Sequence, residues 1–379
     1  MKTSAIILLF LLLPAKVVLA YEFTPKVSLS VSEQYNDNIF LRNSDRTGDF
    51  ITYLSPGIDL SFKSVNSELM LNYSPTFSFY SSHEELNDTA HHIMANGNFT
   101  LSNRLNLTLT ETFVKSNEIQ DIRAIPDLGP VTNLTEVTSN TVSSNMSYKL
   151  TDNISYTIGA SYFFIDYKQP GFSDVTTYSG NMGFTYRQSE RTTLSVNARY
   201  VSYDYELTSD ATEQDYIAGI SYKLTTTLTA VITGGPIITK IKDTGRSDTN
   251  FGGGVDLTKT FNGGQATLSY RQAIAVGTET NVAEPLREQR ISLDLSKFIT
   301  NKINMHMSGS FSSFKSIETN DTNTDEILLS ADLTYSFLPW ADMLLSYSYA
   351  KNNDKVTTID DYYNHIVMLT LRLSYNRKP

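Results

Sequence analysis

The hydrophobic pattern is clearest near the C-terminus, where residues 366–375 read Ile-Val-Met-Leu-Thr-Leu-Arg-Leu-Ser-Tyr. Every second position from Val367 to Tyr375 is apolar, while the intervening positions become polar toward Arg372 and Ser374. Side chains of a strand alternate between two faces, so one face suits hydrocarbon and the other can meet water. About ten residues is the length of a tilted strand that crosses a bilayer. We predict a membrane-spanning strand here, and we expect it to close a barrel.

The same alternation recurs in about eighteen candidate strands, separated by two classes of polar segment. Short turns are expected at 63–66, 102–104, 151–153, 188–191, 225–227, 262–264, 300–302 and 338–342. Longer loops are expected at 41–49, 81–91, 117–137, 168–175, 207–213, 243–248, 278–286, 317–325 and 352–361. Short turns that alternate with long loops are typical of outer-membrane barrels, with the short turns on the periplasmic side. Propeller blades have a similar repeat length but lack this alternation.

Tyrosines mark the expected periplasmic ends of several strands. The segment Ser-Tyr-Lys-Leu-Thr occurs at 147–151 and again at 221–225, and Tyr186 and Tyr375 hold similar positions. Tyrosine is favoured at a lipid–water boundary because its ring is apolar and its hydroxyl needs water. Cross-strand pairing in a β-sandwich is the alternative explanation. We predict an all-β, antiparallel, up-and-down transmembrane barrel of about 18 strands, with both termini in the periplasm.

Composition changes this picture mainly at the N-terminus. Lys2, the apolar run 5–13 and Val18-Leu19-Ala20 form a secretory signal peptide, so we expect residues 1–20 to be removed and 21–379 to form the barrel. Cleavage removes Lys2 and Lys16 and takes the net charge from −10 to −12. The absence of basic runs argues against nucleic-acid binding, and the absence of cysteine excludes disulfides. The 23 Tyr and 19 Phe suit a barrel with lipid-facing and water-facing sides, although a large soluble β protein could share them.

Charged residues inside the strands are expected to face the lumen. A charge on the lipid face would cost about 2–4 kcal/mol at mid-bilayer. The candidate pore-lining residues are Arg199, Asp256, Arg271, Arg290, Asp294, His306, Asp332 and Arg372. They either solvate the lumen or select the solute, and their mixed signs argue against a strict anion or cation filter.

The longest expected loop, 117–137, is unusually apolar. It contains Ile122, Ile125, Pro126 and Leu128. An exposed loop with this many apolar residues usually packs against something. We therefore expect it to fold into the lumen or across the mouth as a constriction, and deletion of residues 122–131 to raise conductance.

Catalytic and metal-binding patterns are weak. His83, His91 and His92 could bind a metal together with Glu84 and Glu85, but a solvated polar loop explains them better. His306 is the only mid-strand candidate for a membrane hydrolase, and no nucleophile or oxyanion site accompanies it. We expect no enzymatic activity, no metal and no cofactor.

The first predicted hairpin carries a family resemblance. Its segments read Ser-Glu-Gln-Tyr-Asn-Asp-Asn-Ile-Phe-Leu at 32–41 and Leu-Ser-Pro-Gly-Ile-Asp-Leu at 54–60. The sequence of these two segments resembles that of the outer-membrane β-barrel porins associated with exopolysaccharide and exosortase systems of Gram-negative bacteria. The motif positions are Tyr35, Asp37 and Asn38, to which the resemblance assigns no role. It implies export of a surface polysaccharide, with a periplasmic polysaccharide-export protein as partner, and supplies no catalytic residues.

These observations leave three functions open for a barrel in the outer membrane. The first is passive export of an exopolysaccharide chain, with Tyr203 and Tyr205 near the outer mouth making sliding contacts with sugars. The second is a general or sugar-uptake diffusion porin, and the third is a structural or adhesive barrel with a blocked lumen. Outer-membrane lipid and lipopolysaccharide would surround the barrel, and the barrel assembly machinery would insert it.

Overall fold

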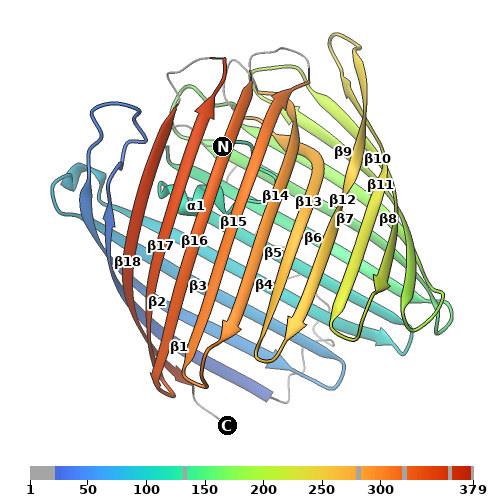
Figure 1. Cartoon of the computed structure of the whole chain (residues 1–379), viewed down its shortest axis with the longest axis horizontal. Coiled ribbons are helices and arrows are strands. Elements are labelled where there is room, and N and C mark those ends of the chain that lie inside the picture. Colours follow the sequence, from blue (N-terminus) through green and yellow to red (C-terminus); the bar gives the residue numbers. More distant parts are fainter. Residues whose placement is uncertain (1–21, 131–134, 279–282, 318–321, 357–360, 377–379) are drawn as a thin grey trace.

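The computed structural model describes residues 22–130, 135–278, 283–317, 322–356 and 361–376. Eighteen strands lie within these ranges (Figure 1). They are β1 (Glu22–Asn36), β2 (Asp49–Lys63), β3 (Ser67–Tyr80), β4 (Asp88–Ser102), β5 (Leu105–Ser116), β6 (Val137–Lys149), β7 (Ile154–Tyr167), β8 (Val175–Arg187), β9 (Thr192–Tyr205), β10 (Ala211–Lys223), β11 (Leu228–Ile241), β12 (Ser247–Phe261), β13 (Gly264–Val276), β14 (Pro285–Phe298), β15 (Ile303–Ser316), β16 (Asn323–Leu338), β17 (Ala341–Asp354) and β18 (Tyr362–Asn376).

Each strand pairs antiparallel with its neighbours in sequence, and β1 pairs with β18 to close the barrel. The closing register sets Val27 opposite Tyr375 and Val31 opposite Leu371. Closure gives every strand a hydrogen-bonded neighbour on each side, which a membrane-spanning sheet requires because lipid cannot satisfy backbone hydrogen bonds. The prediction of an 18-stranded up-and-down barrel closed by the last strand is confirmed.

The alternation of short turns and long loops is also confirmed. All eight expected short turns fall between consecutive strands at one end of the barrel, and the longer segments lie at the other. A short 3-10 helix, Glu84–Leu86, interrupts one long segment, and helix α1 (Ile119–Arg123) interrupts another. Among the described residues, no helix is long and apolar enough to cross a membrane. The expected signal peptide, 1–20, lies outside the described residues.

The two faces of the wall differ as the alternation predicts. On β18, the exposed residues Val367, Leu369 and Leu371 face outward. Across β7 and β8, the outward face carries Tyr156, Ile158, Tyr178 and Met182. The tyrosines expected at the periplasmic ends, including Tyr148 and Tyr222, are exposed on the same outer surface. The barrel therefore presents an apolar exterior with aromatic residues at its ends, as lipid contact requires.

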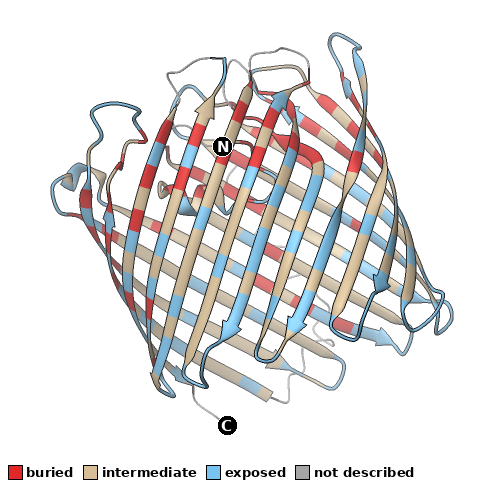
Figure 2. Cartoon of the chain, in the orientation of Figure 1, coloured by how far each residue is buried: buried red, intermediate tan, exposed pale blue. Residues whose placement is uncertain are grey.

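Buried residues gather in the half of the barrel that carries the long loops (Figure 2). The largest buried cluster combines inward side chains of the wall, such as Val137 and Ile165, with Ile122 and Leu128 from the segment between β5 and β6. The opposite half holds few buried residues, as Figure 2 shows. The interior is therefore packed on the loop side and more open toward the short turns.

Candidate functional site: a lumen crossed by an inner loop

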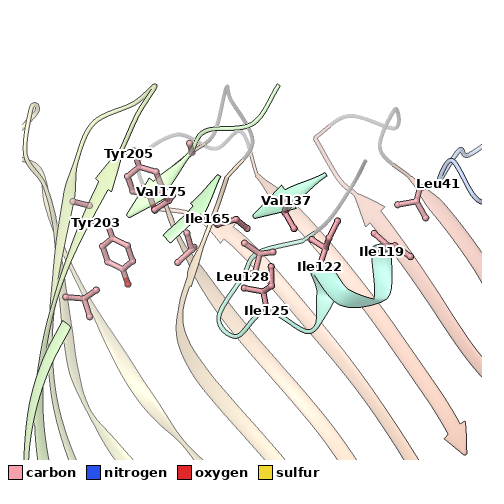
Figure 3. Close-up of a cluster of buried hydrophobic side chains, with 14 of the residues drawn as sticks. Leu41, Ile119, Ile122, Ile125, Leu128, Val137, Ile165, Val175, Tyr203 and Tyr205 are labelled. Carbon is pink, nitrogen blue, oxygen red and sulfur yellow. The ribbon is translucent and has the colours of Figure 1, made fainter. Parts of the chain in front are cut away.

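The segment between β5 and β6 folds inside the barrel. We call its residues 117–130 the inner loop. Ile119 and Ile122 lie on one face of α1, three residues apart, and Pro126 follows where the helix has ended. Ile119, Ile122, Ile125 and Leu128 are all buried against the wall (Figure 3). The apolar residues that made this loop unusual in the sequence are thus its packing surface.

Polar contacts fix the beginning of the inner loop to β2, β3 and β4. The Glu118 carboxylate accepts hydrogen bonds from the hydroxyls of Tyr53 (3.0 Å) and Tyr80 (3.3 Å). Burial raises the pKa of Glu118 to about 7, although the two hydroxyls counteract part of that shift. Asp121 lies 3.2 Å from His92 on β4. Low solvent access strengthens such contacts and makes an unpaired charge costly.

The rest of the inner loop is held by β18, next to β1, and by β13 across the barrel. Arg123 donates a hydrogen bond of 2.7 Å to the hydroxyl of Tyr362 on β18. Asp127 forms an ion pair of 3.0 Å with Arg271 on β13. The backbone N–H of Gly129 donates to the carbonyl of Val276 (2.8 Å). The inner loop therefore crosses the lumen and is attached to strands on opposite walls.

A cavity of about 660 Å³ lies between the inner loop and the wall formed by β14–β18. Gln120 and Arg123 of α1 line one side. The opposite wall presents six inward serines on four adjacent strands, Ser292, Ser308, Ser310, Ser330, Ser346 and Ser348. We call these residues the serine patch. Its hydroxyls can donate and accept hydrogen bonds, and their small size leaves space in front of the wall.

Both arginines beside this cavity have carboxylate partners, and further carboxylates surround it. Arg290 forms an ion pair of 2.6 Å with Glu288, and Glu326 interacts electrostatically with both Arg123 and Arg290. Asp294 and Asp332 also line the cavity. Two arginines therefore face four carboxylates, so the cavity is not an anion-binding site by charge.

The structure brings some of the expected pore-lining residues together and separates others. Arg290, Asp294 and Asp332 line the cavity, and His306 lies 3.7 Å from Asp294. Arg271 contacts the inner loop. Asp256 and Arg372 share the inward parity of their strands and are exposed, away from the cavity.

Arg199, which is partly exposed, and the buried Tyr203 and Tyr205 belong to a structural cluster instead. Arg199 pairs with Asp215 at 2.7 Å and with Glu213, whose carboxylate also accepts a hydrogen bond from Tyr203. Tyr203 and Tyr205 are each only 4% exposed. The expectation that these tyrosines contact a passing polymer is wrong, because both side chains are buried in the apolar cluster that also contains the inner loop.

The residues of the hairpin motif and the histidines His83, His91 and His92 all make contacts with neighbouring side chains or backbone. Asn38 is fully buried and donates hydrogen bonds to the carbonyls of Arg42 (2.8 Å) and Tyr363 (2.9 Å), which fixes the β1–β2 loop against β18. Asp37 pairs with Arg46, and Tyr35 faces outward beside Phe50. His83 contacts Asp49, His91 stacks on Tyr73, and His92 reaches Asp121. Within the described ranges, no cluster of three or more ligating side chains could hold a metal ion.

Sequence reasoning missed most of the cavity. Glu288 and Glu326 share the inward parity of Arg290, so the alternation could have revealed them. The serine patch was hidden because isolated serines are common in such strands. The roles of Glu118 and Arg123 depend on how the inner loop folds back, which no local pattern specifies.

No protein-family model and no curated protein matches this sequence. Solved structures match its fold over nearly the whole chain. OccAB4 of Acinetobacter baumannii is 10% identical with a TM-score of 0.52, and covers 95% of this chain and 99% of its own. The outer membrane protein opdK of Pseudomonas aeruginosa is 12% identical with a TM-score of 0.51, covering 93% and 99%. The same protein with vanillate gives 10% identity and a TM-score of 0.52, covering 94% and 100%. The shared fold and the apolar exterior make this chain a β-barrel of the Gram-negative outer membrane.

Proposed function

We propose that this barrel is a diffusion channel that admits small, polar, uncharged solutes such as mono- and disaccharides. The observation that carries the proposal is the inner loop, which crosses the lumen and leaves a cavity of about 660 Å³ beside it. A cavity of this size is in the range that holds small molecules. The opdK structure with vanillate is a small-molecule complex of a protein with the same fold.

The chemistry of the cavity wall supports a neutral, hydroxylated solute. The serine patch offers hydroxyls, and Gln120 and Arg123 offer donors and an amide oxygen on the facing side. Because the carboxylates of Glu288 and Glu326 compensate the two arginines, an anionic solute gains no net attraction. Weak hydrogen bonds that exchange with water suit passage, since tight binding would slow release.

Export of a polysaccharide is the less favoured interpretation. A polymer chain needs a continuous wide path, and the docked inner loop obstructs one. Export with a periplasmic partner would therefore require the inner loop to leave the lumen first.

A clean deletion of the gene in its own host separates the two functions. We expect slower uptake of labelled small sugars at limiting concentration, with surface polysaccharide unchanged, and restoration by the gene in trans. Loss of surface polysaccharide with normal sugar uptake would overturn the proposal in favour of export.

A further inference from the structure

Strands β12 and β13 are paired with each other over only part of their length. Pairing ends at Gly253 and Gln272, although β12 continues to Ser247 and β13 to Val276. Gly253 has a φ of +131°, a conformation that side-chain-bearing residues rarely adopt, and it lies where β12 turns away. Figure 1 shows the tops of the two strands diverging. Residues 247–252 of β12 and 273–276 of β13 therefore each have an edge that is not bound to the other strand. We call these the upper edges of β12 and β13.

The upper edge of β13 is occupied by the inner loop. The N–H of Val276 donates to the carbonyl of Asp127, and its carbonyl accepts from the N–H of Gly129, both at 2.8 Å. Backbone groups of alternate residues in a strand point to the same side, so Gln272 and Val276 share one edge. Gln272 uses that edge to pair with β12, and Val276 uses it to hold the inner loop.

We propose that the upper edge of β13 is a two-position latch, which binds either the inner loop or the upper edge of β12. In the position seen here the loop is docked and the wall is unzipped. In the other position, which we call zipped, β12 and β13 pair to their ends. The loop is then released and the lumen is wide. The latch regulates the channel of the proposed function, but its geometry does not depend on which solute passes.

The sequence of the two edges suits the zipped position. Continuing the register of the paired part would set Phe251 opposite Ile274 and Asn250 opposite Ala275. Phe251 is 63% exposed on the outer face, and the parity of Ile274 would bring it to the same face. An aromatic residue opposite a β-branched residue is a favourable cross-strand pair. Ile274 is now buried against Ile237 and Ile317, so it has an apolar environment in both positions.

Ion pairs hold the docked position. Arg287, which is paired with Ile274 of β13, contacts Asp248 on β12 at 2.7 Å. Arg271 and Asp127 join the wall to the inner loop at 3.0 Å. Loop release must break the second pair, and zipping requires the N–H and C=O of Val276 that now bind the inner loop. The two positions therefore exclude each other, which is what a discrete switch requires.

Disulfide locking tests the latch directly, because the chain contains no cysteine. The variant Asn250→Cys/Ala275→Cys should trap the zipped position, and Leu128→Cys/Val276→Cys should trap the docked one. In planar bilayers we expect the first to conduct several-fold more than the second. A reducing agent should return both to the behaviour of the unmodified protein.

The pair Thr258→Cys/Thr267→Cys is the matched control. These threonines face each other in the permanently paired part of β12 and β13, with hydroxyls 3.2 Å apart, so their disulfide should leave conductance unchanged. Heat-modifiable migration on gels verifies that each variant forms a barrel. The latch is refuted if Asn250→Cys/Ala275→Cys fails to oxidise where the control oxidises fully, or oxidises without raising conductance. Solute uptake by the unmodified protein tests the proposed function separately.

Discussion

Arg123 and Tyr362, which are 239 positions apart in sequence, are joined by a hydrogen bond of 2.7 Å between the guanidinium and the phenol hydroxyl. Arg123 belongs to the inner loop and Tyr362 to the closing strand β18. Tyr362 is almost completely buried, and the guanidinium carbon of Arg123 also lies 5.7 Å from its ring centre. This contact attaches the far end of α1 to the wall.

Replacing Tyr362 by Phe should loosen the inner loop without opening a cavity. A hydrogen bond to a charged group contributes about 1.5–3 kcal/mol, so loop docking should weaken by about tenfold or more. Single-channel recordings should show more frequent excursions to a higher conductance. Tyr363→Phe is the control, because that side chain lies on the outer face beside Arg46. Identical recordings for both variants would show that the Arg123 contact does not hold the loop.

The docked inner loop should respond to pH through Glu118. Its pKa is raised to about 7 by burial, against about 4.3 when the loop is free, so the docked state binds the proton more tightly. The contribution of Glu118 to docking is therefore greatest below about pH 4.3, where the carboxyl is protonated in both states. This contribution falls as the pH rises to about 7, and it changes little above that value. Conductance should increase over the same interval.

The variant Glu118→Gln isolates this effect from the nearby His92–Asp121 contact. Glutamine keeps an oxygen that can accept from Tyr53 or Tyr80 but carries no charge. We expect its conductance to stay low and to lose most of the dependence on pH between 4.3 and 7. A pH response as large as that of the unmodified protein would exclude Glu118 as its source.

The serine patch should affect sugars more than ions. Ser308 and Ser330 are hydrogen-bonded at 2.7 Å on the cavity wall, and replacing both by Val removes their hydroxyls at similar size. Flux of a neutral sugar should fall several-fold while single-channel salt conductance changes little. Ser161 and Ser179, also 2.7 Å apart but not among the cavity-lining residues, provide the matched double valine control. Equal losses in the two variants would mean that the patch has no special role.

Arg199 should be important for stability rather than for transport. Its side chain pairs with Glu213 and Asp215, which are nearly inaccessible to solvent. Removing one partner of a buried ion pair typically costs about 3–5 kcal/mol, because the remaining charge is left uncompensated. Arg199→Ala should lower the urea midpoint of unfolding in lipid vesicles by a corresponding amount. An unchanged midpoint would show that the two carboxylates are stable without Arg199.

The sequence predicted the barrel well because the apolar alternation is read locally, strand by strand. The positions of all eight short turns followed from polar residues such as those at 151–153 and 225–227. The apolar residues Ile122 and Leu128 also indicated that the inner loop packs against something. These features depend on short-range patterns and on lipid as the outer solvent.

The interior was harder to predict because its contacts join distant residues. Tyr203 was expected at the outer mouth and Arg290 in the lumen, yet Tyr203 is buried in the apolar cluster that includes the inner loop, and Arg290 lines a cavity. The difference depends on where the inner loop docks. Likewise, nothing in β13 alone indicates that Val276 binds Asp127 and Gly129 instead of β12.

The central claim is that the docked inner loop limits this channel to small polar solutes. Liposome swelling with a size series of neutral sugars, from glucose to maltohexaose, measures that limit directly. We predict that the unmodified protein passes glucose readily and largely excludes maltohexaose, whereas deletion of residues 122–131 admits both. Equal rates for the two sugars through the unmodified protein would contradict the account.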